Sequence, residues 1–369
     1  MVDSLEMRAP VRANKLLCSA TLLLLIAAKP TSAQLPVASG QQVAMSNPAW
    51  KLFIPDTYHH RPGGVADVLV HFHGDPQTVW NNALYADLNS VVLTVNYSGL
   101  SSAYSGPFSN ASLFQMLMDE ALTKVRRQRD FPNTLEWDQM GVSSFSAGYG
   151  AVREILKSAT YRNEIDALLA ADSLYATTSG DGTPLDSQMV DYKTFASLAA
   201  TGDKTFLFSH SQVLTYTYEN TMETGDELMQ HLGISTVPIN TKGLGTLDLY
   251  RHAQSGNFQL WGALGANGDA HLEHLRYIGQ FLADLPLSHT PTYTADFDWD
   301  EDVDGADFLM WQRGESPSPL GQAELFDWES SFGSDSGPAI AAVPEPSNTS
   351  LLLLVIAAAF LSRPARFLG

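Results

Sequence analysis

The chain cannot form a disulfide framework, because Cys18 is its only cysteine. A zinc site built on cysteines is excluded for the same reason. Basic residues are also scarce, with 21 lysines and arginines against 40 acidic residues and a net charge of −19. Proteins that bind nucleic acid through phosphate contacts need the opposite balance, so we exclude that class of partner. Hydrophobic residues make up 44% of the 369 residues, which is enough for a sizeable core.

The apolar run near the N-terminus, Leu16–Ala28, is too short to cross a bilayer comfortably, because a span takes ~20 residues. Basic residues from Arg8 to Lys15 precede this run, and small residues ending at Ala33 follow it. This order is typical of a secretory signal peptide. We therefore expect residues 1–33 to be removed when the protein is exported.

A second short apolar run, Leu351–Leu361, lies near the C-terminus and is followed by Arg363 and Arg366. Basic residues favour leaving that end in the cytoplasm, and so short a run suits transient membrane anchoring. With the Pro-Glu-Pro sequence at residues 344–346, the segment 338–369 resembles the PEP-CTERM sorting signal of Gram-negative bacteria. The resemblance implies cleavage by an exosortase-type membrane protease. It also implies display at the cell surface, in the outer envelope or in the extracellular matrix.

The segment before this tail is strongly acidic. Between Pro291 and Ile340 it holds twelve acidic residues and one base, a net −11 of the total −19. Alternating carboxylates on a tight loop repel each other unless a hard cation lies among them, and calcium takes about six to eight oxygen ligands. A loop that starts at Asp296 has carboxylates at positions 1, 3, 5, 9 and 12, whereas a start at Asp300 puts Trp311 at a ligand position. The first register predicts a calcium site formed by Asp296, Asp298, Asp300, Asp302, Asp304 and Asp307.

In that register the loop resembles the calcium loop of type I dockerins. It departs from the dockerin pattern at the sixth position, where Glu301 replaces the glycine favoured by the sharp turn, and it lacks a second loop. The segment Ala306–Gln312 is echoed by Ala323–Glu329, which predicts two amphipathic helices. The resemblance implies a calcium-binding, EF-hand-like module over residues 291–337, with a cohesin-like protein as its partner.

The middle of the chain alternates short apolar runs with amphipathic segments of helical length. The apolar runs predict strands over residues 68–72, 91–95, 140–144, 165–171, 205–209 and 258–263. The amphipathic segments predict helices over residues 112–126, 151–158, 192–200, 222–231 and 271–285. This alternation predicts an α/β domain over residues 34–290, with a mostly parallel sheet and helices on both faces. Ligands then bind at the carboxyl ends of the strands.

One strand end carries a candidate nucleophile. The strand predicted at 140–144 is followed by Ser144-Phe145-Ser146-Ala147-Gly148 and then by a helix. A strand that turns sharply into a helix through small residues pushes Ser146 out over the edge of the sheet. This sequence resembles the G-x-S-x-G nucleophile elbow of α/β-hydrolases, with Ser144 in place of the first glycine. The resemblance covers roughly residues 49–287, whereas the structural alternative for the motif is an ordinary turn rich in serine and glycine.

The same resemblance implies an oxyanion hole. In α/β-hydrolases a turn after an earlier strand supplies one backbone N–H group, and the residue after the nucleophile supplies another. Here that turn is His73-Gly74-Asp75, so the donors would be Gly74 or Asp75 together with Ala147. The His73 side chain is expected to be structural.

The histidine and the acid of the implied triad lie at two other strand ends. The family's histidine follows the last strand, where His271 and His274 lie almost one helical turn apart. We favour His271, because it stands at the junction of loop and helix. Asp172 directly follows the strand predicted at 165–171 and can orient an imidazole there, and Glu219 and Glu223 are the alternatives.

These residues predict an exported serine hydrolase that cleaves an ester, with no cofactor in the hydrolase domain. Display at the cell surface makes an acyl ester on a polysaccharide an attractive substrate. The aromatic residues Trp80, Tyr149 and Tyr175 near the expected ligand edge suit a sugar or an aryl group, and equally suit packing.

Two other classes of protein remain open from the sequence. His71, His73 and Asp75 repeat the H-x-H-x-D start of metal-dependent hydrolases, although Pro76 stands where those families continue with a further histidine. The second alternative is that the chain is a non-catalytic α/β scaffold displayed at the surface.

Overall fold

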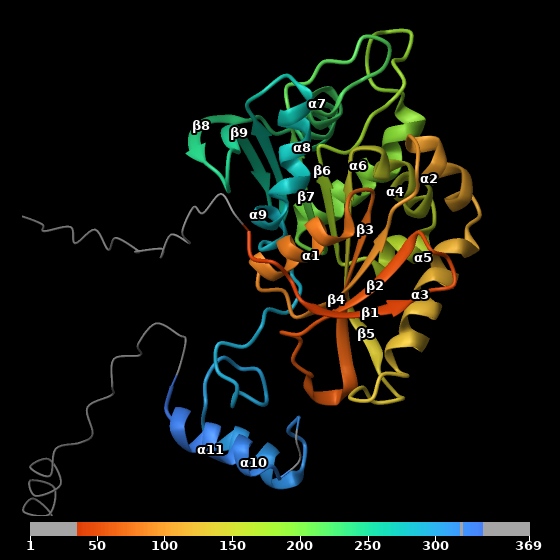
Figure 1. Ribbon diagram of the computed structural model, residues 1–369. Coiled ribbons are helices and arrows are strands. Elements are labelled where there is room, and N and C mark those ends of the chain that lie inside the picture. Colours follow the sequence, from red (N-terminus) through yellow and green to blue (C-terminus); the bar gives the residue numbers. More distant parts are fainter. Residues whose placement is uncertain (1–34, 318–319, 335–369) are drawn as a thin grey trace, which may run out of the picture. The chain divides into compact units, whose positions relative to one another are not determined.

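The computed structural model describes residues 35–317 and 320–334 (Figure 1). The predicted signal peptide with Cys18, and the predicted sorting signal, lie outside the described residues. Within the described ranges, none of the helices combines the length and the apolar character needed to cross a membrane.

A single sheet of ten strands forms the body of the described chain, in the order β1-β2-β4-β3-β5-β6-β7-β10-β9-β8. The strands β4, β3, β5, β6, β7 and β10 run parallel to one another, and the strands on either side of them pair in antiparallel fashion. The mostly parallel sheet predicted from the sequence is therefore confirmed. The strands are β1 (Gly40–Ala44), β2 (Trp50–Pro55), β3 (Val65–Phe72), β4 (Ser90–Val95), β5 (Glu136–Phe145), β6 (Ala167–Ala171), β7 (Thr205–His210), β8 (Val237–Lys242), β9 (Asp248–Ser255) and β10 (Phe258–Ala263).

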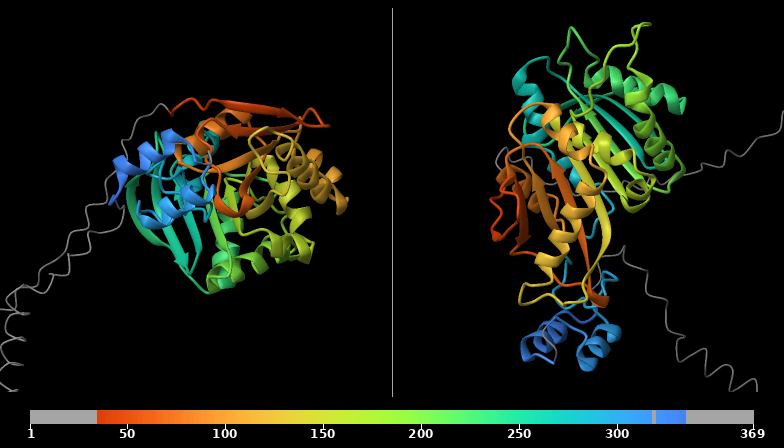
Figure 2. Two further views of the ribbon diagram at one scale, coloured as in Figure 1. Left: turned by 90° about the horizontal axis from the view of Figure 1, so that it is seen from below. Right: turned by 90° about the vertical axis from the view of Figure 1, so that its right-hand side faces the viewer.

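Helices cover both faces of this sheet, as Figures 1 and 2 show. The arrangement is consistent with an α/β-hydrolase fold. The α-helices of this part are α1 (Pro76–Tyr85), α2 (Ser101–Phe108), α3 (Ser112–Val125), α4 (Tyr149–Leu156), α5 (Ala159–Glu164), α6 (Asp186–Thr201), α7 (Thr221–Leu232), α8 (Gly268–Arg276) and α9 (Gly279–Leu282). Two 3₁₀ turns, η1 (Pro62–Gly64) and η2 (Ser146–Gly148), accompany them.

Alternate side chains along the strands pack into two separate hydrophobic cores, one on each face of the sheet. In β3, Val68, Val70 and Phe72 pack into one core with side chains from α2 to α7. Leu69 points the other way and packs with side chains from α1, α8 and α9. Because both faces of the sheet are covered, its central strands are continuous apolar runs, which is why the sequence reveals them.

Two predicted elements differ from the structure. The helix expected over residues 271–285 is broken into α8 and α9 at Tyr277, whose φ of −123° is not helical. The strand expected over residues 165–171 begins only at Ala167, because Ile165 closes α5. Neither difference moves a candidate site residue to another strand end.

The acidic segment forms a small unit with two helices, α10 (Gly305–Arg313) and α11 (Gln322–Ser331). Both fall where the sequence echo predicts helices. Its core consists of Ala295, Phe297 and Val303, against which the two tryptophans Trp311 and Trp328 pack. A core this small contributes little stability by itself.

Candidate active site

Ser146 stands at a sharp corner between β5 and α4. Its φ of 46° lies in the left-handed region, which is strained for a residue with a side chain. The corner closes tightly, since a Cβ on Gly148 would lie 2.1 Å from the backbone oxygen of Phe72, and a Cβ on Gly150 would lie 2.3 Å from that of Ser101. Glycine is therefore required at both positions.

The serine that replaces the first glycine of the motif fits its place. Ser144 is 1% exposed, and its Oγ accepts a hydrogen bond of 2.8 Å from Ser173 Oγ. Ser173 Oγ also lies 3.0 Å from the backbone oxygen of Ser146. The Ser144 hydroxyl is thus satisfied within the network that holds the corner, so the departure from the glycine pattern leaves no buried polar group unpaired.

The structure brings Asp172 and His271 together. Asp172 follows β6 in a left-handed conformation with a φ of 43° and is completely buried. His271 Nδ1 donates to Asp172 Oδ2 over 2.6 Å, and the imidazole stacks on Phe145 with ring centres 4.6 Å apart. This hydrogen bond fixes the tautomer and leaves Nε2 of His271 free to accept a proton.

Asp172 is held as a carboxylate in spite of its burial. Burial alone would raise its pKa, but the nearby His274 and the hydrogen bonds from His271 and Thr221 hold the pKa of Asp172 well below its usual range. Its Oδ1 accepts from Thr221 Oγ1 and, over 2.9 Å, from the backbone N–H of Ser211. A carboxylate with this many donors remains ionised at neutral and mildly acidic pH.

The alternative residues for the histidine and the acid make contacts elsewhere in the fold. His274 is completely buried, its Nδ1 lies 2.8 Å from Ser209 Oγ, and burial lowers its pKa. Glu223 closes the capping box of α7 by accepting from the backbone N–H of Asn220 over 2.8 Å. The backbone of Glu219 pairs with Ala176 in an isolated bridge. The hydrogen bond to His271 is made by Asp172.

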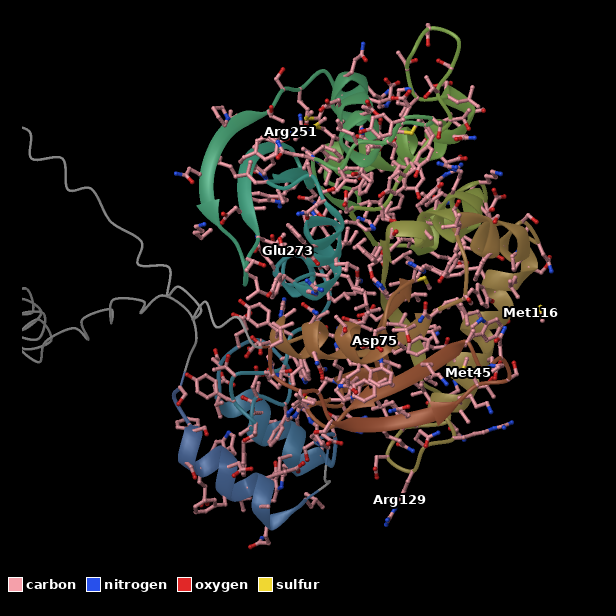
Figure 3. The ribbon with its side chains drawn as sticks, turned by 45° about the horizontal axis from the view of Figure 1, so that its top comes forward. Met45, Asp75, Met116, Arg129, Arg251 and Glu273 are labelled. Carbon is pink, nitrogen blue, oxygen red and sulfur yellow. The ribbon has the colours of Figure 1, made fainter. Side chains whose placement is uncertain are left out.

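The metal-hydrolase alternative is not supported by its three residues. His71 is 1% exposed, and its two ring nitrogens bond to Ser143 Oγ over 2.7 Å and to the backbone oxygen of His73 over 2.8 Å. His73 Nδ1 lies 2.8 Å from Tyr104 Oη. Asp75 caps the amino end of α1 by accepting from the N–H of Thr78 (Figure 3). These side chains serve the fold and do not converge on one point.

Acidification should destabilise the protein through such buried histidines. Burial lowers the pKa of His71 from 6.5 to about 4. On acidification the unfolded chain therefore binds a proton at this residue near pH 6.5, whereas the folded chain binds it only near pH 4. Stability from this group is therefore present above pH 6.5 and is lost as the pH falls to 4, by about 3 kcal/mol. We expect His71→Gln to flatten the dependence of unfolding free energy on pH by about one proton, measured by urea unfolding from pH 7 to 4. The exposed His231→Gln is the control, and an unchanged slope in His71→Gln would contradict the assignment.

The implied oxyanion donors have different surroundings. Ala147 lines the same cavity as Ser146 and His271. Among the described residues, the N–H of Gly74 has only a long contact of 3.4 Å to Asn96 Oδ1, so it is largely available, whereas the N–H of His73 is already bonded to Val95. Gly74 and Asp75 do not line the cavity, and their part in an oxyanion hole stays a prediction.

The cavity at this strand edge has a volume of about 460 Å³. It lies where the sequence predicts a ligand, at the carboxyl ends of the parallel strands. Trp80 was expected near it, but this side chain is buried and stacks on Phe53 with ring centres 4.3 Å apart. The lining residues are Leu100, Ser101, Ser146, Ala147, Tyr149, Tyr175, Val213, Thr215, Tyr218, Gly268 and His271.

Between β7 and α7 the sequence points to Glu219 alone, and the residues of this loop that line the cavity were missed. This loop supplies Val213, Thr215 and Tyr218 to the cavity, and Ser211 and Thr221 at its two ends bond to Asp172. The only signal for the loop was its position after a strand of the sheet, because its residues form no recognised motif.

The acidic loop brings most of its predicted ligands together. Carboxylate oxygens of Asp296, Asp298 and Asp307 lie within 4.8 Å of one another, and so do those of Asp302, Asp304 and Asp307. Asp300 belongs to neither cluster and instead accepts from the backbone N–H of Asp302. Asp307 is shared by both clusters and is fully buried.

Two features of this loop test whether a cation fits. Glu301 adopts a φ of 72°, so the sixth position makes the left-handed turn that glycine makes more easily. Asp298 Oδ1 is buried and has no hydrogen-bond partner among the described residues. Burial together with the carboxylates of Asp307 and Asp300 raises the pKa of Asp298 to about 6. Hard oxygen donors that crowd each other in this way fit a calcium ion.

Comparisons with known proteins give likenesses among solved structures only. No protein-family profile matches the sequence, and no curated protein matches it. A dienelactone hydrolase-like promiscuous phosphotriesterase from metagenomic libraries is 12% identical, with 68% of this chain and 99% of that chain covered and a TM-score of 0.37. A siderophore hydrolase from Aspergillus nidulans is 12% identical, with coverage of 71% and 99% and a TM-score of 0.36. A thermostable carboxylesterase from a metagenomic library is 12% identical, with coverage of 68% and 87% and a TM-score of 0.34. The case for a function rests on the side chains at the carboxyl edge of the sheet.

Proposed function

We propose that this chain is an exported serine hydrolase that cleaves an ester, with Ser146 as nucleophile, His271 as general base and Asp172 as the acid that orients it. The observation that carries the proposal is the 2.6 Å hydrogen bond between His271 Nδ1 and the buried Asp172, in a cavity that also exposes Ser146 at a strained corner. Strain at such a corner is typical of functional residues.

The proposed reaction follows from these roles. Ser146 Oγ attacks the acyl carbon while His271 Nε2 takes its proton, and the same imidazole then protonates the leaving alcohol. Water hydrolyses the acyl-enzyme by the reverse sequence. Backbone N–H groups of Ala147 and of Gly74 or Asp75 would stabilise the oxyanion, and losing one such donor typically slows turnover by roughly a hundredfold or more.

Labelling with a fluorophosphonate tests the proposal directly. This probe reacts covalently with a serine that a base has activated, so we expect labelling of the full chain that maps to Ser146. A folded chain that stays unlabelled would remove the support for a serine hydrolase. Hydrolysis that a chelator abolishes would favour a metal-dependent enzyme, and the absence of any turnover would favour a displayed non-catalytic scaffold.

We also propose that the enzyme works outside the cell. The basic and apolar order of residues 1–33 supports export, and the Pro-Glu-Pro tail supports sorting by an exosortase-type protease after transient membrane anchoring. An acyl ester carried by a polysaccharide at the cell surface or in the extracellular matrix is a substrate that fits this location.

For the segment 291–337 we propose calcium binding and docking to a cohesin-like partner. The two carboxylate clusters that share Asp307, and the unpartnered Asp298 Oδ1, support the cation site. Asp296, Asp298, Asp302, Asp304 and Asp307 would hold the ion. A bound cation would remove the repulsion among these carboxylates and order the loop against its three-residue core.

Asp307→Asn should weaken calcium binding by at least about tenfold, because it removes the charge common to both clusters. The measurement is calorimetric titration of the full chain with calcium chloride. The matched control is Glu329→Gln, which removes one charge from an exposed position on α11. Equal affinities for the two variants, or no binding at millimolar calcium, would contradict the site.

A further inference from the structure

Three tyrosines form one wall of the cavity that holds Ser146 and His271. Tyr149 is the first residue of α4 and follows β5, Tyr175 lies three residues beyond Asp172 after β6, and Tyr218 lies in the loop after β7. The strands β5, β6 and β7 are neighbours in the sheet. Each of three adjacent strand ends thus contributes one aromatic ring to the same side of the site.

The rings pack on one another in the geometry that aromatic pairs favour. The ring centres of Tyr149 and Tyr175 are 5.5 Å apart with a tilt of 50°, and those of Tyr175 and Tyr218 are 5.7 Å apart with a tilt of 71°. Arg153 braces the wall, since its guanidinium lies 4.7 Å from the centre of the Tyr149 ring and donates to the backbone oxygen of Tyr175. The wall is therefore preorganised before any ligand arrives.

The hydroxyl groups of the two inner tyrosines are already engaged. Tyr149 Oη donates to Ser101 Oγ over 3.1 Å, and Tyr175 Oη has a contact of 3.5 Å with the backbone oxygen of Asp172. The polar ends of these side chains are thus held by the protein. What the wall offers to a ligand is mainly the carbon surface of its rings.

The cavity lining also carries no formal charge beside the catalytic base. Among the described residues that line it there is no lysine, arginine, aspartate or glutamate, and His271 is the only imidazole. A charged acyl group would lose its hydration there without finding a partner. A volume of about 460 Å³ is sufficient for an uncharged acyl group with one aromatic ring.

We propose that this enzyme selects esters of uncharged aromatic acids, whose ring packs against Tyr149, Tyr175 and Tyr218 while the alcohol part points out of the cavity. The inference rests on the proposed serine-hydrolase function. The bond from Ser146 Oγ to the acyl carbon forms as the bond to the alcohol oxygen breaks. The Ser146 proton passes through His271 to the alcohol, and water later releases the aromatic acid.

Two esters that differ only in the ring test this selection. Methyl phenylacetate and methyl cyclohexylacetate share their alcohol and their carbon skeleton, and neither carbonyl is conjugated with the ring. We expect kcat/KM of the full chain, measured by pH-stat titration, to favour the phenyl ester by about fivefold or more. Tyr218→Leu should lower this ratio by about twofold or more, since it removes one of the three rings, whereas Tyr218→Phe, which keeps the ring, should preserve it.

Tyr216→Leu is the matched control, because Tyr216 lies in the same loop but is 93% exposed and does not line the cavity. It should keep the wild-type ratio. A wild-type ratio near one, or an unchanged ratio in Tyr218→Leu, overturns the aromatic selection while fluorophosphonate labelling at Ser146 still upholds the hydrolase. Absence of both labelling and hydrolysis overturns the two proposals together. Labelling of Tyr218→Leu shows that the variant is folded.

Discussion

Ser146→Ala should lower kcat/KM for a soluble ester by roughly 10⁴- to 10⁶-fold. The variant loses the atom that forms the acyl-enzyme, whereas His271, Asp172 and the cavity remain in place. What remains is the modest rate that a binding site and backbone donors alone provide. The expected result is a steady-state rate close to background, together with complete loss of fluorophosphonate labelling.

The fold should tolerate this change. Alanine at a φ of 46° is strained to a similar degree as serine, and the network that holds the corner uses the backbone oxygen of residue 146. Ser102→Ala is a suitable control, because Ser102 is exposed on the neighbouring helix α2. A Ser146→Ala protein that keeps a tenth of the wild-type rate would show that another group performs the chemistry.

Asp172→Asn should lower kcat by about 10⁴-fold with little change in the size of the side chain. The reason is that the two carboxylate oxygens of Asp172 have different partners. Oδ1 accepts from Thr221 and from the N–H of Ser211, so the amide oxygen of asparagine must take that side. The amide NH₂ then faces His271 Nδ1 and forces this nitrogen to accept. The proton moves to Nε2, and the imidazole can no longer act as a base toward Ser146.

The effect of this substitution can be separated from a general loss of charge. Glu223→Gln removes a carboxylate from the same region but retains the capping interaction with Asn220, so turnover should stay within about twofold of wild type. Steady-state kinetics of the two variants decide between the acids. A large loss of turnover in Glu223→Gln, with turnover of Asp172→Asn unaffected, would assign the role of the acid to Glu223 instead of Asp172.

The apolar pattern of the sequence reveals the centre of the sheet and not its margins. The six predicted strands correspond to β3, β4, β5, β6, β7 and β10, which lie between helical layers and are continuous apolar runs. Edge strands such as β1 and β8 are mostly exposed, and their residues lack any apolar run. Their pairing depends on neighbours distant in the sequence, which a local pattern does not encode.

The same distinction applies to the candidate site. Ser146, Asp172 and His271 could be picked out because each follows an apolar strand or stands at the start of the helix after the last predicted strand, and the sheet then brings such ends to one edge. The partners that complete the site, such as Thr221 and Tyr218, come from a loop whose path is set by tertiary contacts alone. Whether the acid would reach the histidine could only be decided by geometry, here the 2.6 Å contact.

The position of Asp172 after β6 has a consequence for how the proposed enzyme could diversify. Because the acid is anchored at the end of β6, the turn after β7 carries no member of the triad and is free to contribute Val213, Thr215 and Tyr218 to the binding surface. This part of the binding surface is thus separate in sequence from the proposed triad, unlike Tyr149 and Tyr175, which closely follow Ser146 and Asp172. Mutations between residues 213 and 218 can therefore change the acyl preference while the reacting groups stay intact. This turn is where we expect substrate range to change during evolution.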